Sequence, residues 1–263
     1  MSLSELIKPI RPNRMTLWRI VKPIIPNRYK PYKVPGGRIF LNISESPMML
    51  ARVVGRFEVQ KHRAVLSLLK PGMTFVDVGA NKGDFGLLAA QIVGEKGRVL
   101  SFEPEPTNCH WIRKSVELNG YKNLVLYEAA LADANEQSRL FLGKQSGWHT
   151  LMESMPNRNC GIIPITKRTL DSVLQETGSD RVDVIKIDVE GAEIAVLRGA
   201  VEALKANHDV LLLMDIHPDL GVDPFAVCDL LRSLGFSTYE IEPPYNKPLN
   251  LHSDTRQLMA KRP

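Results

Sequence analysis

Acidic side chains stand near the ends of several short apolar segments of this sequence, where they could bind a ligand. Asp77 lies in one such segment, and the turn that follows it contains Gly79, Ala80, Asn81 and Gly83. The dinucleotide fingerprint GxGxxG requires glycine where Asn81 stands, and the phosphate-binding pattern GxxxxGK[ST] is absent. Without glycine at Asn81, the backbone of this turn cannot approach a pyrophosphate closely. The carboxylate of Asp77 is therefore expected to face a ligand that carries positive charge.

A second acid, Glu103, ends the next apolar segment and is followed by Pro104. An acid at this place can accept the hydroxyls of a ribose. The third segment ends in small residues that include Ala130, where a backbone amide and a small side chain could hold an adenine. Together with Asp77 and Gly79, these positions indicate S-adenosylmethionine, with a carboxylate close to its ammonium or sulfonium group.

Candidate residues for the reaction follow the later apolar segments. We expect His217 to be the general base for a hydroxyl acceptor, because an unperturbed histidine pKa near 6.5 suits neutral pH. We expect Asp188 to contribute to the cofactor site and to orient the acceptor hydroxyl or the imidazole, since an acid that ends an apolar strand has no packing reason to be there. His149, beside Trp148, is expected to line an acceptor pocket. A structural role for His217, as the cap of a strand end, stays open.

A divalent metal is an alternative ligand for this part of the sequence. Asp188, Glu190, Asp215 and His217 could converge as oxygen and nitrogen ligands. Nothing in their spacing demands a metal, and we predict none. Glu190 and Glu193 also have a simpler interpretation, since acids at the start of a helix are stabilised by its positive end.

Strands that alternate with helices position these residues. We predict strands over residues 74–78, 98–102, 124–127, 182–187, 209–214, 237–241 and 257–261. Helices are expected over 48–69, 84–93, 106–119, 170–176, 192–204 and 224–234, whereas 138–166 is expected to be irregular or hairpin-like. This alternation predicts βαβ units and a parallel sheet covered on both faces, with the ligand beyond the carboxyl ends of the strands.

Five sequence blocks resemble the FkbM-type family of S-adenosylmethionine-dependent methyltransferases. They are FVDVGANKGDFG (75–86), SFEPEPTN (101–108), EAALAD (128–133), RTLDSVL (168–174) and VIKIDVEGAEIAVLRGA (184–200). The resemblance implies the class I methyltransferase fold, a Rossmann-like, doubly wound α/β structure with a mostly parallel seven-stranded sheet. It also implies O-methylation of sugars or polyketide-type hydroxyls. One departure is Asp215, because the family usually has glutamate in the Glu-x-His pattern that ends at His217.

The leading hypothesis is therefore O-methylation of a sugar or glycoconjugate, and O-methylation of a small polyketide-type product is the second. A nicotinamide-dependent dehydrogenase would suit Glu103 but not the missing second glycine. A non-catalytic binding module on the same scaffold is the remaining alternative.

Basic residues gather at the start of the chain, although the whole chain of 263 residues has a formal net charge of only +5. Residues 1–40 hold nine bases and one acid, so the remainder is mildly acidic. This segment is rich in proline, which favours an extended, poorly packed arm with at most a short helix near 15–21. We predict a boundary between a basic arm (1–40) and the methyltransferase domain (41–263). The arm is either a solvated tail or a peripheral anchor to an anionic membrane.

Other classes are excluded by composition. Three separated cysteines give neither a disulfide framework nor a thiolate zinc site. No apolar run approaches the roughly 18 residues of a membrane span, and no secretory signal is visible at the start. Nucleic acid is not an expected partner, because the basic residues do not continue onto the body. These features predict a cytoplasmic protein, with contact to the inner membrane surface if the arm is an anchor.

Overall fold

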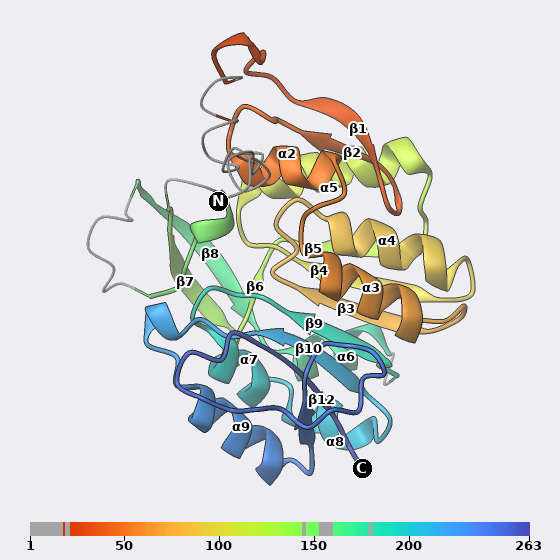
Figure 1. Cartoon of the computed structure of the whole chain (residues 1–263), viewed down its shortest axis with the longest axis vertical. Helices are drawn as coiled ribbons and strands as arrows, with labels where there is room; N and C mark the ends of the chain where they lie inside the picture. Colours follow the sequence, from red (N-terminus) through yellow and green to blue (C-terminus); the bar gives the residue numbers. More distant parts are fainter. Residues whose placement is uncertain (1–17, 19–21, 144–145, 153–159, 179–180) are drawn as a thin grey trace, which may run out of the picture.

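A seven-stranded sheet forms the centre of the chain (Figure 1), which we describe from a computed structural model over residues 18, 22–143, 146–152, 160–178 and 181–263. Its strand order is β11-β12-β10-β9-β3-β4-β5. The strands are β3 (Thr74–Val78), β4 (Arg98–Phe102), β5 (Leu124–Tyr127), β9 (Val184–Ile187), β10 (Leu211–Asp215), β11 (Ser237–Tyr239) and β12 (Gln257–Lys261). Strands β5, β4, β3, β9 and β10 are parallel, whereas β12 pairs antiparallel with both of its neighbours. The predicted mostly parallel, seven-stranded sheet is confirmed.

The register of these strands brings their carboxyl ends to one edge. Val78 of β3 lies opposite Phe102 of β4 and opposite Ile187 of β9. The chain runs outward from β3 in one direction and from β9 in the other, so the strand order reverses between them. A ligand site of an open α/β sheet forms at such a reversal, because the connecting helices diverge there.

Helices cover both faces of the sheet. Helices α3 (Val59–Leu68) and α4 (Asp84–Val93) pack on the face that carries Phe75 and Val99. The opposite face, with Val76 and Leu100, is covered by the later helices. These are α6 (Leu170–Thr177), α7 (Glu193–Arg198), α8 (Val201–Ala206) and α9 (Pro224–Ser233). Two apolar cores therefore sandwich the sheet, as the doubly wound class requires.

Two of the expected helices are divided. Residues 48–69 form α2 (Pro47–Val53) and α3, because Gly55 and Glu58 between them have positive φ angles of 66° and 44°. Residues 192–204 form α7 and α8, with Gly199 between them. A Cβ at Gly199 would lie 1.9 Å from the carbonyl oxygen of Ala132, so glycine allows this close packing.

A smaller sheet follows the third parallel strand. It contains β6 (Ala130–Leu131), β7 (Glu136–Phe141) and β8 (Ile162–Arg168), in the order β6-β8-β7. Strands β7 and β8 pair antiparallel, so the hairpin-like alternative for 138–166 is confirmed where the chain is described. A short 3-10 helix, η3 (Ser146–Trp148), lies in the connection between them.

The N-terminal segment contacts the rest of the chain, and Asn27 accepts a hydrogen bond from Asn42 Nδ2 at 2.7 Å. Strands β1 (Lys30–Val34) and β2 (Gly37–Leu41) form a hairpin that lies against α5 (Pro106–Asn119). The side chains of Ile39 and Leu41 are fully buried, and the Asn119 side chain bonds both backbone polar groups of Arg38 at 2.8 and 2.6 Å. The expectation of a poorly packed arm is therefore wrong for residues 30–40, because the hairpin buries apolar side chains.

The remainder of the expected arm is only partly described. Apart from Trp18, the short helix expected near 15–21 lies outside the described residues. Among the helices that are described, none has the length and apolar character needed to cross a membrane.

Candidate active site

A cavity lies beyond the carboxyl ends of the central strands, where the strand order reverses. Its lining contains Arg52 and Lys186 but a larger number of carboxylates. These are Glu58, Asp84, Glu103, Asp188, Glu190 and Asp215. Six carboxylates against the basic side chains of Arg52, Lys186 and His217 still favour a ligand that carries positive charge.

Most of the residues predicted to bind the cofactor line this cavity. They are Gly79, Ala80, Asn81, Glu103, Pro104, Ala130 and Asp188. Two others, Asp77 and Gly83, do not contribute to the lining. The predicted reaction residue His217 and the predicted acceptor-pocket residues Trp148 and His149 line the same cavity. Residues far apart in the sequence are thus brought together as the parallel topology requires.

Asp77 and Gly83 have structural positions beneath the cavity. The Asp77 side chain is 0% exposed, and its Oδ1 lies 3.4 Å from the Lys186 ammonium. Gly83 precedes helix α4 with a φ of 88°, and a Cβ there would lie 3.0 Å from the Ile112 side chain. Asp77 therefore acts on the cavity through Lys186, and Gly83 allows the sharp entry into the helix.

Gly79 makes the first turn of the site possible. Its φ is 76°, and a Cβ at this position would lie 1.9 Å from the carbonyl oxygen of Asp188. The backbone N–H groups of Gly79 and Ala80 both donate to the carbonyl of Phe102, at 3.1 and 2.9 Å. The turns after β3, β4 and β9 are consequently in direct contact, which fixes the floor of the cavity.

Glu103 is a buried acceptor at the tip of β4. Its carboxylate accepts hydrogen bonds from the backbone N–H of Asn81 at 2.7 Å and of Glu105 at 3.0 Å, and from Asn108 Nδ2 at 3.3 Å. Burial disfavours the charged form more than these bonds favour it, so the pKa of Glu103 rises to about 7. A carboxylate offers about four lone-pair positions, which leaves about one for a ligand hydroxyl.

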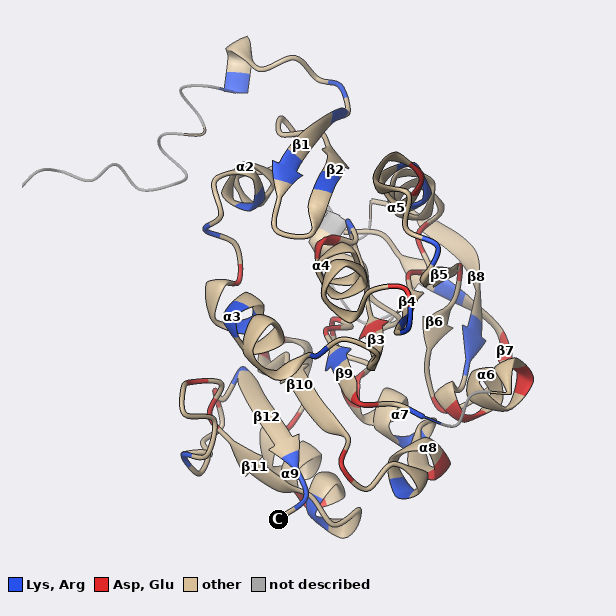
Figure 2. Cartoon of the chain, turned by 90° about the vertical axis from the view of Figure 1, so that its right-hand side faces the viewer, with Lys and Arg blue, Asp and Glu red and all other residues tan. Residues whose placement is uncertain are grey.

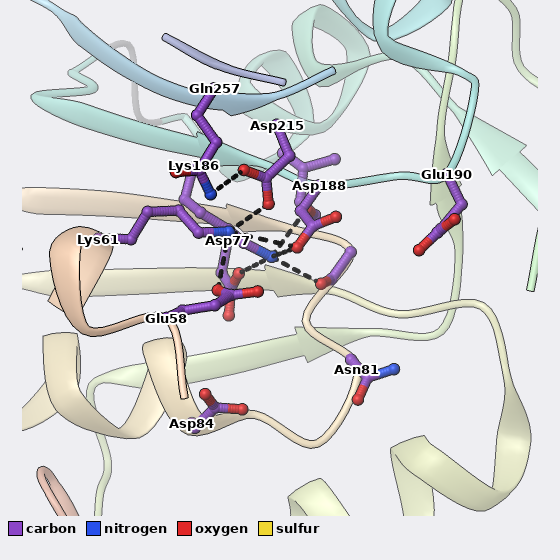
Figure 3. Close-up of polar contacts among 12 residues, drawn as sticks. Glu58, Lys61, Asp77, Asn81, Asp84, Lys186, Asp188, Glu190, Asp215 and Gln257 are labelled. Atoms are coloured by element: carbon purple, nitrogen blue, oxygen red, sulfur yellow. Dashed lines mark hydrogen bonds and ion pairs between the residues drawn. The ribbon is translucent and has the colours of Figure 1, made fainter. Parts of the chain in front are cut away.

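Two buried lysines lie among the carboxylates of the site (Figure 3). Lys61 of α3 forms ion pairs with Glu58 at 2.7 Å, with Asp188 at 3.5 Å and, more closely, with Asp215. Lys186, on β9, donates to the carbonyl of Gly79 at 2.8 Å and lies 3.8 Å from Asp188. Asp188 therefore faces two ammonium groups.

These charges separate the pKa values of the two strand-end aspartates. Burial disfavours the ionised form of Asp188, but the ammonium groups of Lys61 and Lys186 outweigh it and lower the pKa. Burial and the charge of Asp188 raise the pKa of Asp215 to about 7, in spite of Lys61. Gln257 donates to the remaining Asp215 oxygen at 2.9 Å. Asp188 is thus the permanent anion of the pair.

His217 lies within a ring of carboxylates rather than in a neutral setting. Its Nδ1 is 2.5 Å from Glu193 Oε1, and its Nε2 is 3.7 Å from Asp188 and 3.6 Å from Glu190. Burial lowers the histidine pKa, but the bond to Glu193 and the charges of Glu190 and Asp188 outweigh it and raise the pKa to about 9. The expectation of an unperturbed pKa is therefore wrong, and the imidazole is protonated at neutral pH.

Glu193 has a role beyond stabilising a helix start. It is the first residue of α7, as the simpler interpretation required, but its side chain is 0% exposed and bonds His217. A carboxylate on Nδ1 directs the other ring nitrogen towards Asp188 and Glu190. The Glu193–His217 dyad thus holds the imidazole in a fixed orientation at the cavity wall.

His149 differs from His217 in charge. Its Nδ1 accepts a hydrogen bond from the backbone N–H of Gly143 at 3.1 Å, and burial lowers its pKa. His149 is consequently neutral at physiological pH. A neutral imidazole next to Trp148 gives a wall suited to a polar, uncharged ligand.

The four residues considered as metal ligands fall into two overlapping groups. The donor atoms of Asp188, Glu190 and His217 lie within 4.8 Å of one another, as do those of Glu58, Asp188 and Asp215. In the second group, which also includes Glu58, the Lys61 ammonium already forms an ion pair with each of the three carboxylates.

Several residues of the cavity were not found from the sequence. Arg52 of α2, Lys61 of α3 and Glu58 immediately before α3 precede the first strand of the sheet, and their positions in the sequence resemble ordinary exposed ones. Lys186 had a readable signal, because it interrupts the fully buried strand VIKI. A charged side chain in such a strand needs a buried partner.

The fold and the site together define a doubly wound α/β protein with a ligand cavity at the reversal of its strand order. A model of the Methyltransferase FkbM domain matches residues 77–238 of the chain. The chain belongs to this methyltransferase family, and the resemblance found from the five sequence blocks is confirmed.

Curated relatives match the chain over parts of their length. The 2-O-methyltransferase NoeI of Sinorhizobium fredii is 29% identical over 54% of this chain and 64% of its own length. The AMB antimetabolite synthetase AmbE of Pseudomonas aeruginosa is 26% identical over 74% of this chain and 12% of its own length. The chain thus spans less than two thirds of either relative.

Solved structures resemble the chain at low identity. The FkbM methyltransferase of Methylobacillus flagellatus has 16% identity and a TM-score of 0.46, and the match covers 81% of this chain and 52% of that protein.

Proposed function

We propose that this chain transfers a methyl group from S-adenosylmethionine to a hydroxyl group of a sugar or glycoconjugate. The observation that carries the proposal is the cavity itself, in which an acidic wall suited to a cationic ligand meets the oriented Glu193–His217 dyad. A methyl-transfer site needs both features, because the donor is a cation and the acceptor must lose a proton.

The cofactor would be held by the turns at the sheet edge. The Gly79–Asn81 turn and Pro104 supply backbone and small side chains, Glu103 supplies an acceptor for a ribose hydroxyl, and Ala130 leaves room for an adenine. Asp188 is the negative charge available to a sulfonium or ammonium group. When bound, S-adenosylmethionine supplies a methyl group that is already activated on a positively charged sulfur.

His217 would take the proton of the acceptor hydroxyl at Nε2. It must first lose its own proton, and a positive charge that enters the same cavity lowers its pKa and favours that loss. Glu193 holds Nδ1, so the ring presents Nε2 in a fixed direction. A positioned general base contributes about 10²–10⁴-fold in rate, and correct alignment of the reactants contributes about 7–11 kcal/mol.

Two variants test the assignment of these residues. We expect Asp188→Ala and His217→Ala to lower kcat about 10²-fold or more, as loss of a positioned acid–base group does. Unchanged turnover in both variants would remove the proposed mechanism. If wild-type protein bound S-adenosylmethionine but methylated no acceptor, a non-catalytic binding module would be the better interpretation.

The neutral imidazole of His149 at the cavity wall and the family resemblance support a sugar as the acceptor. The similarity to the 2-O-methyltransferase NoeI supports a hydroxyl group as the atom methylated. A small natural-product hydroxyl is the second candidate, since AmbE matches 74% of this chain. Incubation with a labelled methyl donor and parallel sets of glycans and polyketide-type alcohols separates the two. Label only on the polyketide-type set would overturn the sugar assignment.

A further inference from the structure

Basic side chains cluster on the N-terminal hairpin and on the segment that leads into it. We call this surface the basic face and define it by Lys22, Arg28, Lys33 and Arg38. No aspartate or glutamate occurs between residues 22 and 44. Figure 2 shows the basic residues on β1, on β2 and on the segment before them, without acidic residues on those strands.

The cations of the basic face lack anionic partners within the protein. None of the four forms an ion pair with a carboxylate in the part of the chain that the structure describes. Lys33 and Arg38 even lie directly opposite each other in the hairpin register, and both are exposed. Like charges at directly opposed positions destabilise a sheet, and an external anion over them would relieve this repulsion.

The basic face is built on a fixed support. Asn119 of α5 bonds the backbone of Arg38, Ser115 accepts a hydrogen bond from Phe40, and Ile39 beneath them is 0% exposed. The cations of the hairpin are therefore held in place before any partner binds. Preorganised charges bind a surface at a smaller entropic cost than charges on a free tail.

An exposed apolar side chain beside these cations favours a lipid membrane over other anionic partners. Ile24 is 81% exposed, the highest value among the large hydrophobic residues of the described chain that are exposed, and it lies in η2 (Lys22–Ile24). Lys22 lies over the ring of Trp18 at 4.6 Å. An exposed isoleucine among cations suits the boundary between lipid headgroups and acyl chains, whereas it has no favourable contact on a nucleic-acid backbone.

The rest of the chain is slightly acidic, which favours an orientation with the basic face towards an anionic membrane. Residues 1–40 hold nine bases and one acid, whereas the chain as a whole holds 34 bases and 29 acids. The body is therefore slightly acidic and is repelled by an anionic membrane that attracts the basic face. We propose that residues 22–38 dock the protein peripherally on a membrane of anionic phospholipid, with the cations at the headgroups and Ile24 inserted beside them.

Vesicle binding tests the proposal independently of any methyl transfer. Full-length protein is sedimented with vesicles of 70% phosphatidylcholine and 30% phosphatidylglycerol, and with vesicles of phosphatidylcholine alone. We expect binding to the anionic vesicles only, and its loss in high salt, because screening weakens these contacts. Binding to neither kind of vesicle, or equally to both, would overturn the proposal.

A matched pair of double variants assigns the binding to the basic face. Each base near an anionic surface contributes about fivefold in partitioning, so Lys33→Gln with Arg38→Gln should weaken binding about 25-fold. Lys70→Gln with Lys96→Gln makes the same change in charge at two exposed lysines in loops that are not part of the basic face, and should retain binding within about twofold. Equal weakening in the two variants would contradict a localised docking surface.

Two further measurements keep the result interpretable. The melting temperature of the Lys33→Gln, Arg38→Gln variant should be no lower than that of wild type, because the change removes a like-charge pair. Competition with a DNA duplex separates the two kinds of polyanion. A duplex that displaces the protein from vesicles at lower phosphate concentration than the lipid itself would assign the basic face to nucleic acid instead.

Discussion

At the scale of single residues, the charge state of His217 decides what the site can do. Its raised pKa means that folding is stabilised by the protonated imidazole among Glu193, Glu190 and Asp188. This contribution is fully present below the unfolded pKa near 6.5 and is lost as pH rises through about 9. The same shift delays the appearance of a free base, so stability and activity depend on pH in opposite directions.

The pH dependence of turnover tests the Glu193–His217 dyad. We expect kcat/KM to rise with pH to a midpoint of about 9, because this parameter reports the free enzyme. The midpoint of kcat should lie lower, since a cationic ligand favours the neutral imidazole. In Glu193→Gln both midpoints should fall, because the strongest stabiliser of the imidazolium is removed, while cofactor affinity changes little. Unmoved midpoints in this variant would contradict the dyad.

Lys61 is expected to be a large contributor to stability. Its ammonium is buried and pairs with Glu58, Asp188 and Asp215, so Lys61→Met leaves three carboxylates without it. Removal of one partner from a buried ion pair costs about 3–5 kcal/mol of unfolding free energy. Lys114→Met breaks an exposed pair with Glu117 and should cost no more than about 1 kcal/mol. Urea denaturation measures both, and equal losses would show that the Lys61 cluster is not a buried network.

At the scale of elements, the N-terminal hairpin belongs to the folded domain. Ile39 of β2 is fully buried with Leu41, Met49 and Leu87, so Ile39→Ala should lower the unfolding free energy by about 2–5 kcal/mol. Ile24→Ala is the matched control at an exposed site and should change it by no more than about 0.5 kcal/mol. If Ile39→Ala lowered the unfolding free energy by less than about 1 kcal/mol, the hairpin would not be part of the folded core, and residues 1–40 would be a separate arm, as expected from the sequence.

Elements with local signals were predicted well from the sequence. Helix α5 has the predicted bounds because Pro106 begins it after the Glu105 cap and Gly120 ends it in a left-handed conformation. The division between α7 and α8 depends instead on the approach of Gly199 to Ala132, a contact between distant segments. The hairpin was missed for a similar reason, since its apolar side chains matter only once α5 lies beneath them.

The same distinction applies to the site. Asp188 and Glu103 could be predicted as site residues, because a buried acid at the end of an apolar strand is unfavourable unless it has a partner. Lys61 is invisible, because its burial results from the way α3 lies over the sheet. The raised pKa of His217 likewise depends on Glu193, whose side chain turns towards the histidine only in the folded chain.

At the scale of the whole molecule, the active site extends beyond the family domain. The domain match begins at residue 77, whereas Arg52, Glu58 and Lys61 reach the cavity region from the segment of α2 and α3 before it. Charge is also divided between an acidic cavity and the basic face on the hairpin. The N-terminal elements thus complete the site and, on our proposal, bring it to a membrane.

The most direct test of the central claim is calorimetric titration of the full-length protein with S-adenosylmethionine, with NAD titrated in parallel. We predict one binding site for S-adenosylmethionine, no binding of NAD, and loss of binding in Gly79→Val, where the side chain would meet the Asp188 carbonyl. Binding of NAD without S-adenosylmethionine, or binding of neither compound, would contradict the assignment of the cavity to a cationic methyl donor.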